Sequence, residues 1–385
     1  MRRAILALVL LGVVATCAWA AHSYLTSGRA AEKVFAQLAS LYDGPLQLDS
    51  VEIGIAGSSV SGLRFFEEEG GAPEPWLTVE HASADLSIWN LLADNPMPGR
   101  LDLDGAFLRL RFDASGRLLT RIPAQPSAKQ RAWPSLNFHN CTVAIEQLGR
   151  PAFTVHGVEA SLKPDQGTLV AKGTVADSYW GTWTLSGKID PQTGRGESLL
   201  ATERTDVSMA KLQAIPFVSP NVWEQVHVDA QTTVQLRLVF DPAAGSWKYR
   251  VEMHPEQAKV YVKAITLQSD RVEGIVIVED GQVTLKELHG MTADGGIATN
   301  AQLDFRKPLR EMTFAISVNR VDTRRLPKEW RLPVLFGGHL TGNALLKVTV
   351  GGEPHVLTTG EGKGRLNDRL PVRMIADVTG FHFSL

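Results

Sequence analysis

The chain has 385 residues, of which 44% are hydrophobic and 21% are charged, and its formal net charge is −2. This composition is typical of a globular protein, and it lacks the clustered basic excess of a protein that binds nucleic acid. The 34 glycines and 20 prolines indicate many turns between short strands, which argues against an all-helical architecture.

The amino terminus predicts a membrane anchor within residues 1–27. Arg2 and Arg3 precede an uncharged apolar run from Ala4 to Ala21, about the length that crosses the hydrocarbon core of a bilayer as a helix. The two arginines should stay in the cytoplasm. The side chains expected to contact lipid in this anchor include Ile5, Leu8, Leu11, Val14 and Trp19.

Two other interpretations of this segment stay open. A cleaved signal peptide fits Ala18-Trp19-Ala20, which has a small-x-small pattern just before Ala21. A lipoprotein would instead be modified at Cys17. All three interpretations place the chain from about His22 onward outside the cytoplasm.

An amphipathic helix is expected next, within residues 28–45. Val34, Leu38 and Leu41 recur at helical spacing, and Gly44-Pro45 ends the pattern. Its apolar side is narrow and its basic residues are few. These features favour packing over one end of the following sheet rather than lying on the membrane surface.

From Leu46 onward the apolar residues alternate with polar ones, which is typical of strands with one buried and one solvated side. The alternation is longest from Val226 to Phe240. A turn at residues 241–245 then leads into a second alternating strand from Trp247 to Met253, so these two strands should form an antiparallel hairpin. Further strands are expected at residues 260–267, 272–279, 283–288, 297–305 and 312–318.

Two segments interrupt the strands, Val207 to Gln225 and Val321 to Gly338. Each opens with a V-x-x-x-[KR]-L element, continues through prolines and a tryptophan, and leads into an alternating strand; their starts are 114 residues apart. This spacing hints at a diverged repeat with short helical crossovers. The expected organisation is therefore a first β block at 46–205, a second at 206–320, and the start of a third repeat at 321–385.

Glycines near the end of the second interruption predict backbone geometry rather than a phosphate site. Gly337-Gly338 should bend the chain into the next strand, and Gly342 then leaves a shallow place on the apolar side of that strand. The later run Gly360 to Gly364 lacks the spacing of a phosphate-binding loop.

Residues that would carry catalysis do not form a recognisable set. The ten histidines show no metal-ligand spacing, and the chain has no G-x-S-x-G nucleophile motif. Cys141 is expected to be a small buried strand residue. We therefore predict a protein that is not an enzyme and that binds no cofactor or metal.

Several degenerate β patterns occur in a fixed order after the predicted anchor. They are Val51-Glu52-Ile53, Gly62 to Phe65, Leu77-Thr78-Val79, Ala84 to Leu92, Gly99 to Leu110, Leu285 to Gly290 with Gly295-Gly296-Ile297, and Leu332 to Gly342. In this order the chain resembles the AsmA-like family of envelope proteins, which is similar in build to the bridge-like lipid-transfer proteins.

This resemblance implies a protein anchored in the inner membrane of a diderm bacterium, with most of the chain in the periplasm. The implied fold is mainly β: an N-terminal transmembrane helix followed by an elongated, curved antiparallel sheet that forms a groove. The implied function is to carry or organise lipids bound for the outer membrane. Members that bridge both membranes are often much longer, which leaves three interpretations of this chain: a short member, a member that needs a partner, or a truncated sequence.

Two hypotheses follow from these patterns. In the first, the apolar side of the sheet is a groove that binds acyl chains of phospholipid or another acylated lipid without catalysis. In the second, a membrane-tethered structural or assembly protein has a closed β core and recruits other envelope proteins. The groove residues of the first hypothesis are Val226, Val228, Val234, Leu236, Leu238, Phe240, Trp247, Tyr249, Val251, Met253, Phe305, Phe314, Ile316, Leu346 and Val348.

Overall fold

The computed structural model describes Tyr42 and residues 44–54, 57–67, 73–87, 98–121, 133–217, 226–241, 246–306, 309–351 and 356–385. Within these residues the chain is mainly β, with 20 strands, and the mainly β prediction is confirmed. No helix in the described ranges is long and apolar enough to span a bilayer. The predicted anchor at 1–27 lies outside these ranges, as does nearly all of the predicted helix at 28–45.

The chain divides into two compact units. Unit 1 comprises residues up to Asp113, residues 117–148 and residues 154–173, and unit 2 comprises residues 114–116, 149–153 and 174–385. Each unit is built on its own paired strands and is described separately below.

Strands β1 to β8 belong wholly or mostly to unit 1. β1 and β2 both pair with β3, and β3, β4 and β5 are antiparallel neighbours. β5 and β6 are parallel, with Arg100 opposite Ser135 and Phe112 opposite Gln147, so one pair departs from the antiparallel sheet expected from the sequence. A parallel pair needs a long connection, and residues 113–134 supply it. The bounds are β1 Leu46–Gln47, β2 Ser50–Ile53, β3 Ser58–Phe65, β4 Leu77–Ala84, β5 Arg100–Phe112, β6 Ser135–Gln147, β7 Phe153–Asp165 and β8 Thr168–Asp177.

A small apolar cluster forms the core of unit 1. Leu63, Val79 and Ala106 are buried there together with Cys141, so the prediction of a small buried cysteine is confirmed. Burial raises the pKa of the Cys141 thiol, because the thiolate would lose its hydration there.

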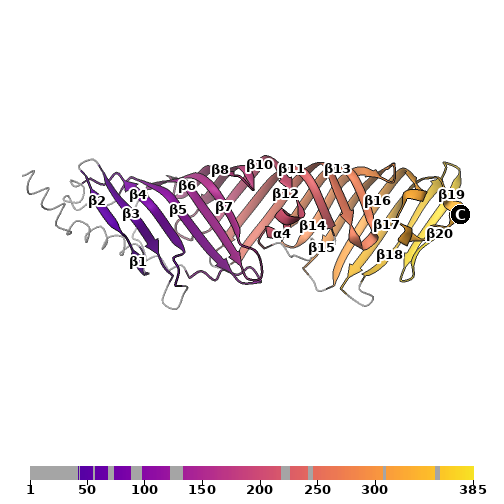
Figure 1. The fold of residues 1–385 in the computed structure, drawn as a ribbon, viewed down its shortest axis with the longest axis horizontal. Helices are drawn as coiled ribbons and strands as arrows, with labels where there is room; N and C mark the ends of the chain where they lie inside the picture. The colour runs from indigo at the N-terminus through magenta and orange to yellow at the C-terminus, as the bar shows by residue number, and fades with distance from the viewer. Residues whose placement is uncertain are drawn as a thin grey trace, which may run out of the picture. The chain divides into compact units, whose positions relative to one another are not determined.

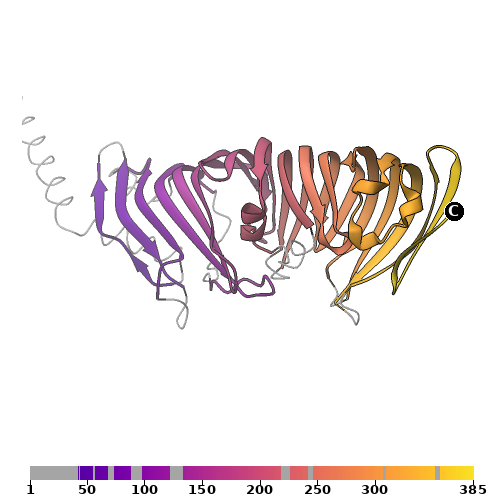
Figure 2. The same cartoon turned by 45° about the vertical axis from the view of Figure 1, so that its right-hand side comes forward.

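Strands β9 to β20 build unit 2, and each pairs antiparallel with the next along the chain. Figures 1 and 2 show these strands side by side in chain order. The bounds are β9 Gly181–Ile189, β10 Gly196–Val207, α4 Met209–Ala214, β11 Val226–Asp241, β12 Ser246–Val262, η1 Lys263–Ile265, β13 Leu267–Glu279, β14 Gln282–Thr292, β15 Gly295–Asp304, β16 Arg310–Asp322, η2 Thr323–Arg325, η3 Lys328–Trp330, η4 Val334–Phe336, β17 His339–Val350, β18 Val356–Leu366, β19 Leu370–Asp377 and β20 Gly380–Ser384.

The predicted hairpin from Val226 is confirmed, because β11 ends at Asp241 and pairs with β12, which begins at Ser246. The single strand predicted at 260–267 is wrong. η1 splits it, and Val262 lies opposite Leu267 across a turn that ends at Thr266 with φ of 53°. The unbroken apolar run concealed a chain reversal, since the left-handed residue is not a glycine.

Bulges change the alternation within several strands of unit 2. In β12, Met253 and Ala258 face the same side although five positions separate them, because Gln257 has φ of 49° and the pairing shifts there. Arg271 in β13, Glu287 in β14 and Arg320 in β16 are left-handed in the same way, each at a shift of register. A residue in this conformation adds one position to its strand and moves the apolar side chains to the opposite parity.

The two predicted crossovers connect neighbouring strands instead. β10 pairs directly with β11, and β16 pairs with β17, so residues 208–225 and 323–338 cross no strand. Antiparallel neighbours need only a tight turn, which leaves these longer segments available for packing against the sheet. Leu212 of α4 is buried in the same apolar cluster as Met312 and Val348, and Trp330 of η3 packs against that cluster.

Candidate functional site

The candidate site is the apolar face of unit 2, the side of β10 to β20 that carries the main apolar cluster of this unit. Two hollows lie on it. The first, here the α4 chamber, lies between α4 and strands β10 to β16 and encloses about 860 Å³, counting the part open to solvent. The second, here the Trp330 chamber, lies between η3 and strands β13 to β20 and encloses about 730 Å³ on the same basis.

Hydrocarbon lines the α4 chamber. Its lining includes Leu212 of α4, Val228 of β11, Met253 of β12 and Val276 of β13, and no ionisable side chain is part of it. The one hydroxyl, on Thr232, donates a hydrogen bond to the backbone carbonyl of Thr233 over 2.9 Å. A ligand in this chamber would therefore gain from burial of apolar surface rather than from polar contacts.

The local sequence positions α4 over this chamber. The hydroxyl of Ser208 accepts a hydrogen bond from the backbone N–H of Lys211 at 3.4 Å and caps the helix. Leu212 then points toward the sheet with 3% of its surface exposed. Beyond the end of the helix, Arg150 donates a hydrogen bond to the backbone carbonyl of Ile215 over 2.9 Å.

Trp330 closes one side of the second chamber. Its indole N–H donates to the carbonyl of Ile265 over 2.9 Å, and its ring centre lies 4.9 Å from that of Phe381. Phe336 and Phe383 make a similar ring contact, with 6.0 Å between centres. The connection between β16 and β17 thus reaches both η1, the turn after β12, and strand β20.

Glycines form part of the wall of the Trp330 chamber. Gly342 of β17 lies opposite Gly364 of β18, and both line the chamber. A Cβ atom at Gly342 would lie 2.5 Å from the carbonyl oxygen of Lys363, so the strands can approach this closely only with glycine there. The expectation that Gly342 lies on the apolar side is confirmed. Gly338, with φ of 155°, makes the bend before β17.

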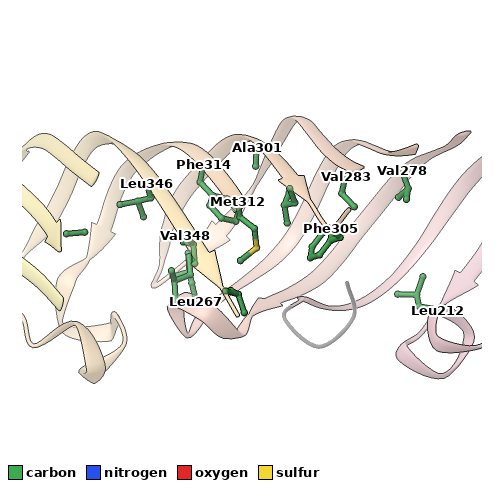
Figure 3. Packing of buried hydrophobic residues seen from close by; sticks show 14 of the residues in the cluster. Leu212, Leu267, Val278, Val283, Ala301, Phe305, Met312, Phe314, Leu346 and Val348 are labelled. Atoms are coloured by element: carbon green, nitrogen blue, oxygen red, sulfur yellow. The ribbon is translucent and has the colours of Figure 1, made fainter. Parts of the chain in front are cut away.

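The chain's own side chains fill the rest of the face. Met312 and Val348 have no exposed surface, and Leu303 and Leu346 are 2% exposed. Figure 3 shows Met312, Val348, Phe314 and other members of this cluster on neighbouring strands. The apolar face is therefore hollow in two places and densely packed elsewhere.

The structure separates the predicted groove residues into several groups. Val228, Met253 and Phe314 line the α4 chamber, and Ile316 and Leu346 line the Trp330 chamber. The other members have different surroundings. Phe305 and Val348 are buried in the packed cluster, Tyr249 and Val251 pack against it, Val234 is buried, and Leu236, Leu238 and Phe240 are half-buried. The side chains of Val226 and Trp247 lie outside the described ones.

Sequence reasoning missed much of the lining. Ala258, Val260 and Val272 line the α4 chamber but follow a bulge, so the alternation assigned from upstream residues misplaces them. Val276 and Val283 also line the chamber and lie in strands that the sequence predicted. Their alternation with polar residues was the signal that could have placed them on the apolar side. Leu212 and Trp330 lie outside the strands, and nothing in the local sequence indicates that they contact the apolar face.

Two polar groups lie next to this face at its α4 end. Burial raises the pKa of the Tyr249 phenol, whose oxygen accepts the backbone N–H of Gly281 over 3.2 Å. Burial also lowers the pKa of the half-buried Arg150, whose charge acts on the same phenol. In the described ranges no group of three or more His, Cys, Asp or Glu side chains is placed to hold a metal ion.

Comparison with known proteins adds no relative. No family model, no curated protein and no solved structure matches the chain.

Proposed function

We propose that this protein binds lipid acyl chains along the apolar face of unit 2, which acts as a hydrophobic groove. The α4 chamber carries this proposal, because it is open to solvent in part yet lined by apolar side chains from α4 and all seven strands β10 to β16. Exposed apolar surface of this kind is retained in soluble domains mainly where a ligand or partner covers it.

The gain from burying a chain is large enough to hold a lipid. Each methylene removed from water contributes about 0.8 kcal/mol, so ten methylenes contribute about 8 kcal/mol before the cost of ordering the chain. The hydroxyls next to the two chambers, on Thr232 and Thr292, already donate to backbone carbonyls. The α4 chamber therefore suits hydrocarbon, whereas the lining of the Trp330 chamber also includes Asn343 and Lys363.

The cellular setting of the proposal rests on the predicted anchor and on the resemblance to the AsmA-like family. We place the protein in the inner membrane of a diderm bacterium as a single-pass protein whose bulk is periplasmic. There it would take part in lipid transport to the outer membrane and in envelope biogenesis, without catalysis.

A crosslinking experiment tests lipid binding directly. A photoreactive residue at Val228 lies in the α4 chamber, whereas the same residue at Gln235 lies on the opposite, exposed side of β11. After expression in a diderm bacterium and irradiation, mass spectrometry of the full-length protein should find phospholipid attached at position 228 and much less at position 235. Equal labelling at both positions, or none at 228, would refute the proposal.

A second candidate is a membrane-tethered assembly protein with a closed core. The complete burial of Met312 and Val348 favours it, since part of the apolar face is already a packed interior. On this hypothesis the α4 chamber is an internal packing defect, and position 228 would crosslink to neighbouring residues of the chain instead of to lipid.

A further inference from the structure

Arg150 lies at the rim of the apolar face of unit 2. It belongs to the turn that precedes β7, and its Nη1 atom donates to the carbonyl of Ile215 over 2.9 Å. Ile215 follows α4, and its backbone N–H donates in turn to the carbonyl of Leu212, which lines the α4 chamber. Arg150 is thus bonded to the residue that ends α4, three positions after a side chain of the chamber wall.

The guanidinium of Arg150 makes one hydrogen bond to the described residues, the bond to Ile215. Among the described residues no carboxylate forms an ion pair with Arg150, although the side chain is half-buried. Asp280, in the turn between β13 and β14, accepts the backbone N–H of Tyr249 over 3.2 Å. A guanidinium has five N–H donors, so the single bond to Ile215 leaves several for another acceptor.

Removing a cation from water without an anionic partner is costly, so a half-buried guanidinium of this kind is a candidate for binding an anion. Lys211, on α4, differs from Arg150 in this respect. Its ammonium lies 5.1 Å from the ring centre of Tyr179, an exposed aromatic contact that already stabilises it. Within the described residues Arg150 has neither an ion pair nor an aromatic contact; its charge acts on the Tyr249 phenol, and Ile215 supplies its hydrogen-bond acceptor.

We infer that Arg150 binds the phosphate of a phospholipid whose acyl chains occupy the α4 chamber. This inference rests on the proposed function and adds a headgroup class to it. A planar guanidinium matches a phosphodiester through two parallel N–H donors, and a single positive charge matches the single negative charge of that group. The chamber would hold the chains, and Arg150 would fix which end of the lipid lies at the rim.

Titration of the purified full-length chain in mild detergent tests the inference. The probes are phosphatidylglycerol and a diacylglycerol with the same acyl chains, which lacks the phosphate. Arg150→Gln removes the charge but keeps an amide N–H for the carbonyl of Ile215. We expect this variant to bind phosphatidylglycerol at least about tenfold more weakly and diacylglycerol as the wild type does. Arg150→Lys should recover part of the affinity for phosphatidylglycerol.

The control is Arg237→Gln, which removes the same charge from an exposed position on the opposite side of β11 and should change neither affinity. If Arg150→Gln weakened the binding of both lipids equally, Arg150 would only tether the end of α4. If it weakened the binding of neither, the inference would also fail. Either result would leave the proposed function intact. If the wild type bound oleate more tightly than phosphatidylglycerol and Arg150→Gln lost that preference, the ligand of Arg150 would be a carboxylate and the inference of a phosphate would be wrong. Binding of neither lipid by the wild type would instead overturn the proposed function and this inference with it.

Discussion

Trp330 donates its indole N–H to the carbonyl oxygen of Ile265 over 2.9 Å, and this bond joins the segment between β16 and β17 to η1, the turn after β12. The two residues are 65 positions apart in the sequence, and Ile265 is 4% exposed. A buried carbonyl that loses its donor keeps the cost of its lost hydration. The Trp330 chamber therefore depends on this contact for its closed side.

Trp330→Phe should lower the free energy of unfolding by about 1 to 3 kcal/mol, because it removes the donor and keeps an aromatic ring beside Phe381. Trp330→Ala should cost more, about 3 kcal/mol or above, since the ring contact is lost as well. Urea denaturation of the full-length chain measures both. Trp133→Phe, at an exposed position, serves as the control, and an equal effect of the two Trp→Phe changes would contradict the prediction.

Gln257 and Gln302 offer a matched test of the bulges. Both are exposed glutamines within strands of unit 2, but only Gln257 is left-handed, with φ of 49°. A β-branched residue is strained in that conformation and favoured in an ordinary strand. Gln257→Val should therefore destabilise by about 1 to 2 kcal/mol, whereas Gln302→Val should be neutral or slightly stabilising.

Gln257→Gly completes this comparison, since glycine adopts a positive φ without steric cost and should leave stability nearly unchanged. Thermal unfolding of the three variants beside the wild type is the measurement. If valine is tolerated equally at 257 and 302, the bulge in β12 does not constrain the strand, and the shared orientation of Met253 and Ala258 needs another cause.

The same bulges limit what the sequence predicts. The alternation from Val226 to Phe240 was readable because no left-handed residue changes its parity, and the turn after Asp241 carries a proline and a glycine. Gln257 is an ordinary strand residue by type. Its conformation is set by pairing with neighbouring strands, so the change of parity after it leaves no local trace.

The sequence predicted the residues of the candidate site only where no bulge precedes them within the strand. Val228 of β11 and Met253 of β12 precede the bulge at Gln257 in the sequence. Both were predicted to lie on the apolar side, and both line the α4 chamber. Val260 follows that bulge and was missed. The bond between Trp330 and Ile265 joins segments distant in sequence, and neither spacing nor composition encodes which strands such a segment lies against.

Val228 and Val348 should respond differently to a buried charge. Val348 has no exposed surface, so Val348→Asp places an unpaired carboxylate in the packed cluster and should cost more than about 4 kcal/mol or prevent folding. Val228 lines the partly open α4 chamber, where water can reach the carboxylate. We expect Val228→Asp to cost about 1 to 2 kcal/mol and to abolish lipid binding.

Urea denaturation and the lipid content of the purified chain give the two readouts. Thr313→Asp, on the exposed side of β16, controls for the added charge and should change neither. Equal destabilisation by the changes at 228 and 348 would indicate that the α4 chamber is closed, and this outcome would favour the assembly protein over the lipid-binding groove.

Asp322 makes the stability of the β16 end dependent on pH. The side chain and the backbone N–H of Arg324 donate to its carboxylate, with distances of 2.9 Å and 3.1 Å to the oxygen Oδ1, and these bonds lower the pKa of Asp322 to about 2 from its usual 3.8. Because the folded state holds the charged form, Asp322 contributes stability above pH 3.8. That contribution is lost as the pH falls from about 3.8 to about 2.

Asp322→Asn removes the charge while keeping the size of the side chain, so the wild type should exceed this variant in unfolding free energy most clearly at pH 5. The difference should shrink at pH 3 and be small at pH 2, because the wild-type carboxylate of the folded state is then about half protonated and that of the unfolded state is neutral. Arg324→Gln removes the partner instead and should show the same narrowing on acidification. Urea denaturation at the three pH values measures it, and a difference that stays constant or grows toward pH 2 would show that the Arg324 bonds do not hold Asp322 in its charged form.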